Sequence, residues 1–125
     1  LVINQWLMAQ MGTVGPMIGQ HHQFHHYNPG KSEFGENRYF KISERIYKEL
    51  DRRLASSKFL AGKNYTIADI ATFPWIARHK WHDIGLKKRC YLIKTHMSFN
   101  PIFYEFFDLF VLLFSVKYCN FLTCP

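Results

Sequence analysis

Four histidines near the end of the first predicted helix are the side chains best suited to metal chemistry. His21 and His25, like His22 and His26, are four residues apart, a spacing at which two imidazoles on a helix can share one metal ion. A zinc site needs a third or fourth ligand, and the nearest carboxylate, Glu33, lies across a turn. The simpler interpretation is a polar helix end, with imidazoles near the negative end of the helix dipole. We therefore predict no metal site, and a metal-binding module stays open as an alternative.

Thr66 and Asp69 are a second pair of polar residues, with types and spacing that allow mutual hydrogen bonds at a helix start. The Thr66 hydroxyl can accept from the backbone N–H of Asp69, and the Asp69 carboxylate can accept from the N–H of Thr66. Tyr65 and Ile70 have the spacing of a hydrophobic staple around the same cap. This pairing explains both polar residues, so we interpret Thr66 and Asp69 as a structural capping box and not as a catalytic pair.

The helix that this cap begins is predicted to run from residue 66 to about residue 81, with a bend at Pro74. It is apolar on most faces, which is typical of a helix in the middle of a bundle. Ile67, Ile70 and Trp75 are therefore expected to be buried.

Two earlier segments also have helical periodicity. Residues 2–26 follow the spacing of an amphipathic helix, with a kink or break expected near Gly15 because Pro16 cannot donate to the helix ladder. After a turn at residues 27–31, a second helix is predicted over residues 32–56. Its apolar stripe contains Tyr39, Ile42, Ile46, Tyr47, Leu50 and Leu54, and its charged face contains the pairs Glu44/Lys48 and Glu49/Arg53. The fold class is all-α.

Composition excludes several classes of function. The chain has 125 residues, which suits one domain. Its formal net charge is +7, and positively and negatively charged residues alternate along most of the sequence. Without a block of Lys and Arg, we expect no nucleic-acid binding. The three cysteines (Cys90, Cys119 and Cys124) lack zinc-ligand spacing, which favours a reducing, cytoplasmic compartment. The sequence carries no signal peptide pattern, and because it reads as if it begins inside a helix, we expect further sequence upstream.

Residues 87–125 differ in character from the rest of the chain. They carry no clear helix cap, and residues 103–116 are strongly apolar but contain two acidic residues. This run is too short for a membrane span, which needs about 20 apolar residues. We interpret residues 87–125 as a divergent apolar tail, and we hypothesise that it is an out-of-frame reading of an AT-rich gene.

Five segments carry a resemblance to a known family. The sequence resembles the C-terminal domain of bacterial glutathione S-transferases over residues 1–86, and in particular the nu-class disulfide-bond reductases and the related fungal nitrogen-regulator proteins. The matching segments are residues 5–20 (QWLMAQMGTVGPMIGQ), 36–39 (ENRY), 50–54 (LDRRL), 59–62 (FLAG) and 65–71 (YTIADIA).

The resemblance implies one part of a two-domain enzyme. In this family a thioredoxin-like N-terminal domain, absent here, binds most of the glutathione and activates its thiol. The helical domain supplies an arginine that contacts a glutathione carboxylate, and Arg38 stands at the matching position. The implied co-substrates are glutathione and a small electrophile or disulfide, the implied assembly is a homodimer, and the isolated chain is expected to be inactive.

One further alternative stays open on the sequence alone. The chain is then a non-enzymatic helical interaction module, which acts by dimerisation or by docking to a membrane surface through its apolar residues. We do not expect association with a membrane on the first interpretation.

Overall fold

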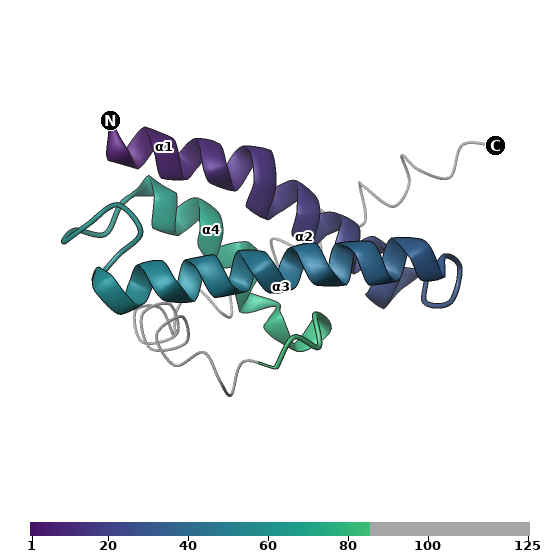
Figure 1. Ribbon diagram of the computed structural model, residues 1–125. Coiled ribbons are helices and arrows are strands. Elements are labelled where there is room, and N and C mark those ends of the chain that lie inside the picture. The colour runs from purple at the N-terminus through teal and green to yellow at the C-terminus, as the bar shows by residue number, and fades with distance from the viewer. Residues whose placement is uncertain (86–125) are drawn as a thin grey trace.

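A helical rod forms the first 27 residues of the computed structural model, which describes residues 1–85. The rod consists of α1 (Val2–Ala9), a π-helical turn η1 (Gln10–Val14), α2 (Gly15–His21) and a second π-helical turn η2 (His22–Tyr27) (Figure 1). Of the kink or break predicted near Gly15, the break is wrong, because the backbone of this residue is helical, and the irregularity is the π-helical turn that ends at Val14. Pro16 is the second residue of α2, one residue after η1 ends, so its missing N–H lies beside the π-turn and the helix does not end there.

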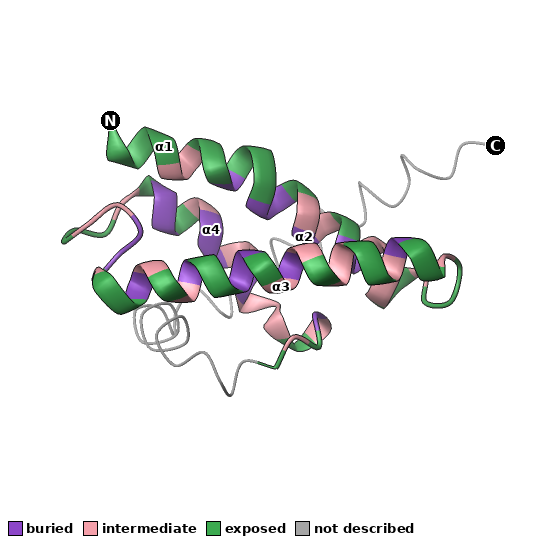
Figure 2. Cartoon of the chain, in the orientation of Figure 1, coloured by how far each residue is buried: buried purple, intermediate pink, exposed green. Residues whose placement is uncertain are grey.

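The second long helix, α3 (Glu33–Ser56), follows a short turn and lies along the rod (Figure 1). Ser32 is its N-cap, and the hydroxyl of this residue accepts a hydrogen bond from the N–H of Gly35 at 3.1 Å. Buried positions recur on one side of α3 (Figure 2). Four residues of the predicted stripe are buried, namely Ile46, Tyr47, Leu50 and Leu54, while Tyr39 and Ile42 are half-buried.

The third element is α4 (Ile67–Ala77), which packs against α1, η1 and α2. It continues through Pro74 and ends at Ala77, four residues before the predicted end, and a 3₁₀ turn η3 (His79–Trp81) follows it. Ala68, Phe73 and Ile76 are buried, but Ile67 and Ile70 are 55% and 50% exposed. The expectation that Ile67 and Ile70 are buried is therefore wrong, because neither side chain belongs to the core cluster.

The core lies where the rod, α3 and α4 meet. It contains Val14, Ile18, Ile46, Tyr47, Leu50, Leu54, Leu60 and Ile76. Trp75 is half-buried and packs against this cluster, with its ring over Gly15 and Gly19. The all-α architecture predicted from the sequence is confirmed.

None of the helices in residues 1–85 combines the length and apolar character that crossing a bilayer requires. The apolar tail predicted for residues 87–125, with its frameshift hypothesis, lies outside the described residues.

Candidate functional site

Arg38 lies on the second turn of α3 and is exposed. Within residues 1–85 no carboxylate forms an ion pair with its guanidinium. A guanidinium can donate two parallel hydrogen bonds to one carboxylate, which an ammonium group cannot do. The position therefore suits an external carboxylate ligand.

Other cationic side chains share the helix face of Arg38. At 3.6 residues per turn, Lys41 and Arg45 lie within about 60° of Arg38 around the helix axis, and all three are exposed. Phe34, which is 76% exposed, lies on the same face one turn earlier. This surface, which we call the Arg38 face, combines positive charge with one uncovered aromatic ring.

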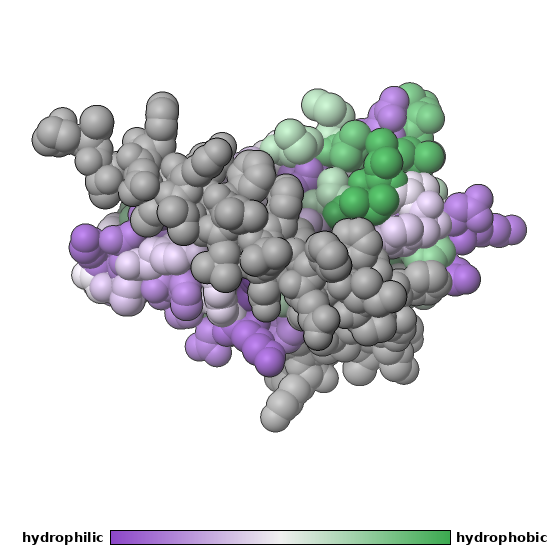
Figure 3. Space-filling model, turned by 180° about the vertical axis from the view of Figure 1, so that it is seen from behind, coloured by the Kyte–Doolittle hydropathy of each residue, from purple (hydrophilic) through white to green (hydrophobic). Residues whose placement is uncertain are grey.

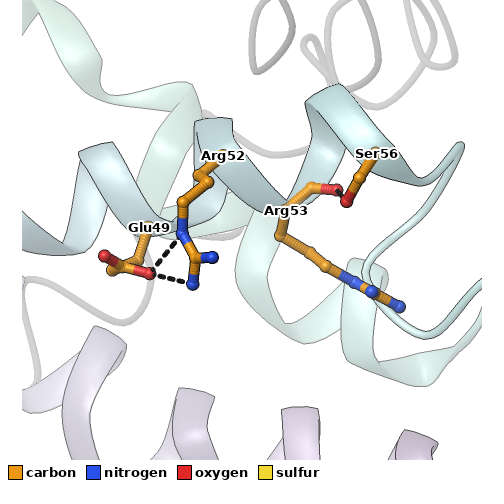
Figure 4. A network of polar contacts seen from close by, with 4 residues as sticks. All are labelled: Glu49, Arg52, Arg53 and Ser56. Atoms are coloured by element: carbon orange, nitrogen blue, oxygen red, sulfur yellow. Dashed lines mark hydrogen bonds and ion pairs between the residues drawn. The ribbon is translucent and has the colours of Figure 1, made fainter.

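The charged residues at the end of α3 are committed to contacts within the chain. Arg52 turns back to Glu49 with distances of 2.7 and 3.0 Å, whereas Arg53 points away from that pair (Figure 4). Arg53 Nε donates instead to the carbonyl oxygen of Leu60 at 2.8 Å. The predicted pair Glu49/Arg53 is therefore wrong, while Glu44/Lys48 is confirmed at 3.1 Å.

Thr66 and Asp69 lie at the start of α4 in the arrangement of a capping box. Asp69 Oδ2 accepts from the backbone N–H and from the hydroxyl of Thr66, both at 3.0 Å. Asp69 Oδ1 accepts from the N–H of Leu60 at 2.9 Å, and Asp69 is fully buried. The carboxylate thus holds the turn before α4 to the first turn of the helix, which is a structural use of both oxygens.

A cluster of three buried imidazoles joins parts of the chain that are about 60 residues apart. His82, just after η3, is its centre: the carbonyl oxygen of His82 accepts from His21 Nε2 at 2.8 Å. The Nε2 atoms of His22 and His82 share a short hydrogen bond, and the Tyr47 hydroxyl bonds His82 Nδ1 at 2.5 Å. The rings of His22 and His82 stack with centroids 4.5 Å apart. We call these four residues the imidazole cluster.

Burial keeps the imidazole cluster neutral. Desolvation, reinforced by the positive charge of Arg78, lowers the pKa of His22 from 6.5 to about 3. Desolvation, reinforced by the neighbouring histidines, lowers the pKa of His82 to about 2. Burial also lowers the pKa of His21, although its hydrogen bond to the His82 carbonyl opposes the shift.

The interpretation of the histidines as a polar helix end is wrong for His21 and His22, which are buried. His25 and His26, which follow His22 in η2, are half-buried and exposed, respectively. His25 stacks on His21 at 4.9 Å, and the exposed His26 stacks on Trp81 at 4.4 Å. Among residues 1–85, no three His, Cys, Asp or Glu side chains are grouped as ligands of a metal ion.

Sequence reasoning missed His82 and the role of Tyr47. Tyr47 was predicted only as part of the apolar stripe, and His82 was not singled out. No local signal connects them, because the contacts join η2, α3 and the end of η3 across sequence separations of 35 to 61 residues.

Comparison with known families identifies the fold. The family model of the glutathione S-transferase C-terminal domain matches residues 8–98. The chain therefore belongs to this family, and the resemblance predicted from the sequence is confirmed. The matched range continues beyond residue 86, where the predicted domain ends.

Curated relatives include two proteins of Escherichia coli. The chain is 46% identical over 72 residues to the disulfide-bond oxidoreductase YfcG, which covers 58% of this chain and 34% of that protein. It is 41% identical over 70 residues to the disulfide-bond oxidoreductase YghU, covering 56% of this chain and 24% of that protein. The chain thus spans no more than about a third of the length of these relatives.

Solved glutathione transferases have the same fold. A transferase from Burkholderia graminis, with two glutathione molecules bound per subunit, matches with a TM-score of 0.72 and 30% identity over 79% of this chain and 44% of its own. A transferase from Pseudomonas putida, with one glutathione disulfide bound per subunit, matches with a TM-score of 0.71 and 34% identity over 79% and 46%.

Proposed function

We propose that this chain is the helical, substrate-side part of a glutathione transferase that acts as a glutathione-dependent disulfide reductase. The similarity to YfcG and YghU, which are disulfide-bond oxidoreductases, supports this class of reaction. The glutathione and glutathione disulfide bound to the similar transferases support glutathione as the co-substrate. The second substrate is a small electrophile or a disulfide.

The observation that carries the proposal for this chain is the Arg38 face. Arg38 is exposed on α3, with Lys41 and Arg45 on the same side, so an anionic tripeptide meets positive charge there. The Arg38 guanidinium binds one glutathione carboxylate through its two parallel donors. Thr66 and Asp69 position α4 and take no part in the reaction.

The isolated chain is inactive on this proposal, because the residues that activate the glutathione thiol belong to a thioredoxin-like domain. The expected result is no turnover of chlorodinitrobenzene or of a hydroxyethyl disulfide by the 125-residue chain. Turnover above the uncatalysed rate would contradict this part of the proposal.

Binding is tested separately from turnover, by NMR titration of the chain with glutathione disulfide. We expect the backbone amide signals of α3 around Arg38 to shift on addition of the ligand. Arg38→Lys should lose most of the response, because an ammonium group has no planar fork. Arg52→Lys is the matched control, since Arg52 already pairs with Glu49 at 2.7 Å. An unchanged response in Arg38→Lys would exclude Arg38 as the carboxylate contact.

A second candidate function is that of an interaction module, and the exposed apolar side chains favour it. Apolar atoms gather over the beginnings of α1 and α4 (Figure 3), where Val2, Ile3, Ile67 and Ile70 are all at least 39% exposed. Such a patch is typical of an interface. Both candidate functions include a homodimer, which sedimentation velocity can test. We expect the unmodified chain to sediment as a dimer and the Ile70→Asp variant to sediment as a monomer.

We also propose a cytoplasmic location, because a reductase that uses glutathione needs a compartment in which the thiol stays reduced. Fractionation with antibodies against the chain tests this location. Recovery in a secreted or membrane fraction would contradict it.

A further inference from the structure

The imidazole cluster has no part in the proposed glutathione chemistry, yet three buried hydrogen bonds meet at its central residue, His82. We propose that it is a pH-sensitive latch, which holds η3 and His82 against α2, η2 and α3 while its imidazoles are neutral and releases this segment in acid. The inference goes beyond the proposed function and does not depend on it.

All three hydrogen bonds of the latch involve the same residue, His82. Its carbonyl oxygen, its Nε2 atom and its Nδ1 atom each have a different partner, namely His21, His22 and the Tyr47 hydroxyl. The first two partners lie on the rod and the third lies on α3. Withdrawal of His82 therefore breaks all three contacts together.

The hydrogen bonds of the cluster cannot all be kept when every ring is protonated. A carbonyl oxygen can only accept, so His21 Nε2 carries the hydrogen in its bond to His82. His21 Nδ1 is buried and has no hydrogen-bond partner among the described residues, so a proton added there has no acceptor. His22 and His82 share one hydrogen between their Nε2 atoms, and protonation of both would set two N–H groups against each other.

The charged groups around the cluster oppose a further positive charge. From η2, His25 stacks on His21 and His26 acts electrostatically on His22. From the end of α4 and from η3, Arg78 acts on His22 and His79 acts on His82. Lys80 is exposed and acts on His79. From α3 the titratable group in contact is Tyr47. Asp83, the acidic neighbour of His82 in sequence, is exposed.

The rest of α4 has anchors of its own, so opening of the latch stays local. Asp69 holds the start of this helix to Leu60, and Ile76 packs in the core. The released segment is therefore η3 together with His82, and the capped end of α4 stays in place. Acid then uncovers the half-buried Trp81, whose ring lies against His22, His26 and Arg78.

Amide hydrogen exchange of the chain at pH 7.5 and pH 5.0, corrected for intrinsic rates, tests the latch. If a histidine regains its ordinary pKa of 6.5 on release, the open state gains about 30-fold in population between these pH values for each histidine exposed. We expect this loss of protection in residues 79–82, with residues 68–73 staying better protected than residues 79–82 at both pH values, because the latch opens without unfolding α4. Equal protection of residues 79–82 at both pH values would overturn the proposal.

Two variants sharpen the test. His22→Gln keeps a side-chain N–H donor near His82 but does not titrate, so the pH response of residues 79–82 should fall by about 30-fold. His26→Gln is the matched control, because His26 is exposed on the same π-turn, and it should keep most of the response. A full response in His22→Gln would overturn the proposal.

A measurement on the unmodified chain covers the case in which His22→Gln fails to fold. The ring protons of His22 and His82 are followed by NMR from pH 8 to pH 4. The latch requires both rings to resist protonation until residues 79–82 lose protection. Titration of both rings near pH 6.5 with residues 79–82 still protected would refute it.

Discussion

Asp69 Oδ1 accepts a hydrogen bond from the backbone N–H of Leu60 at 2.9 Å, although the two residues belong to different segments. The same carboxylate accepts two hydrogen bonds from Thr66 through its other oxygen. One buried side chain thus fixes both the start of α4 and the turn that precedes it.

Replacement of Asp69 should therefore cost more than the loss of an ordinary helix cap. We expect Asp69→Ala to lower the free energy of unfolding by about 2–4 kcal/mol, since it leaves the buried Leu60 N–H unpaired and removes the cap. Urea denaturation monitored by circular dichroism measures the change. Thr66→Ser, which keeps a hydroxyl at the cap, should cost less than about 1 kcal/mol. Equal losses in the two variants would contradict this account.

The glycines of the rod should respond differently to a methyl group. A Cβ at Gly15 would lie 3.2 Å from Gln10 Nε2 and 3.3 Å from the Trp75 ring, whereas a Cβ at Gly12 would meet nothing within 4 Å. We expect Gly15→Ala to destabilise the fold by about 1–3 kcal/mol through overpacking. Gly12→Ala should be neutral or stabilise it by up to about 1 kcal/mol through helix propensity. Thermal unfolding of both variants checks the difference in sign.

Two adjacent arginines near the end of α3 provide a matched pair. Arg52 forms an exposed ion pair with Glu49, so Arg52→Ala should change the free energy of unfolding by less than about 1 kcal/mol. Arg53 donates to the Leu60 carbonyl at 2.8 Å and its guanidinium lies 5.8 Å from the centroid of the Trp6 ring. Arg53→Ala should therefore cost about 1–2 kcal/mol. Similar values for both variants in urea denaturation would show that the buried contacts contribute little.

Global stability should decrease in acid because of the imidazole cluster. The pKa values of His22 and His82 are lowered in the folded chain, so the unfolded chain binds more protons below pH 6.5. The stabilisation is complete above pH 6.5 and is lost progressively as the pH falls from there toward about 3. At pH 5.0 the free energy of unfolding should be lower by about 2 kcal/mol for each of these histidines. Denaturant midpoints measured from pH 8 to pH 4.5 test the trend, and a midpoint independent of pH would contradict it.

Local sequence signals predicted most of the fold. The N-cap at Thr66, the turn at residues 27–31 and the apolar stripe of α3 each depend on residues close together in the chain, and the structure has the corresponding elements. The boundary of α4 and the pairing of Arg53 were wrong. Both depend on contacts that spacing within one helix does not specify.

The candidate site was only partly predictable. Arg38 was found through the family resemblance and not through its own chemistry, because a lone exposed arginine has no distinctive spacing. The imidazole cluster could not be found, because it needs Tyr47 and His82 to meet the rod in three dimensions. The exposure of Ile67 and Ile70 likewise depends on which face of α4 the rod covers.

The π-helical turns change how the rod must be engineered. Such a turn closes hydrogen bonds one residue later than an α-helix, so it offsets the side chains that follow by up to about 100°. A helical wheel drawn through residues 2–27 as one regular helix would therefore assign wrong faces after η1 and again within η2. Any graft or redesign of this rod should keep the number of residues in η1, because a one-residue deletion there would swing His21 and His22 out of alignment with His82.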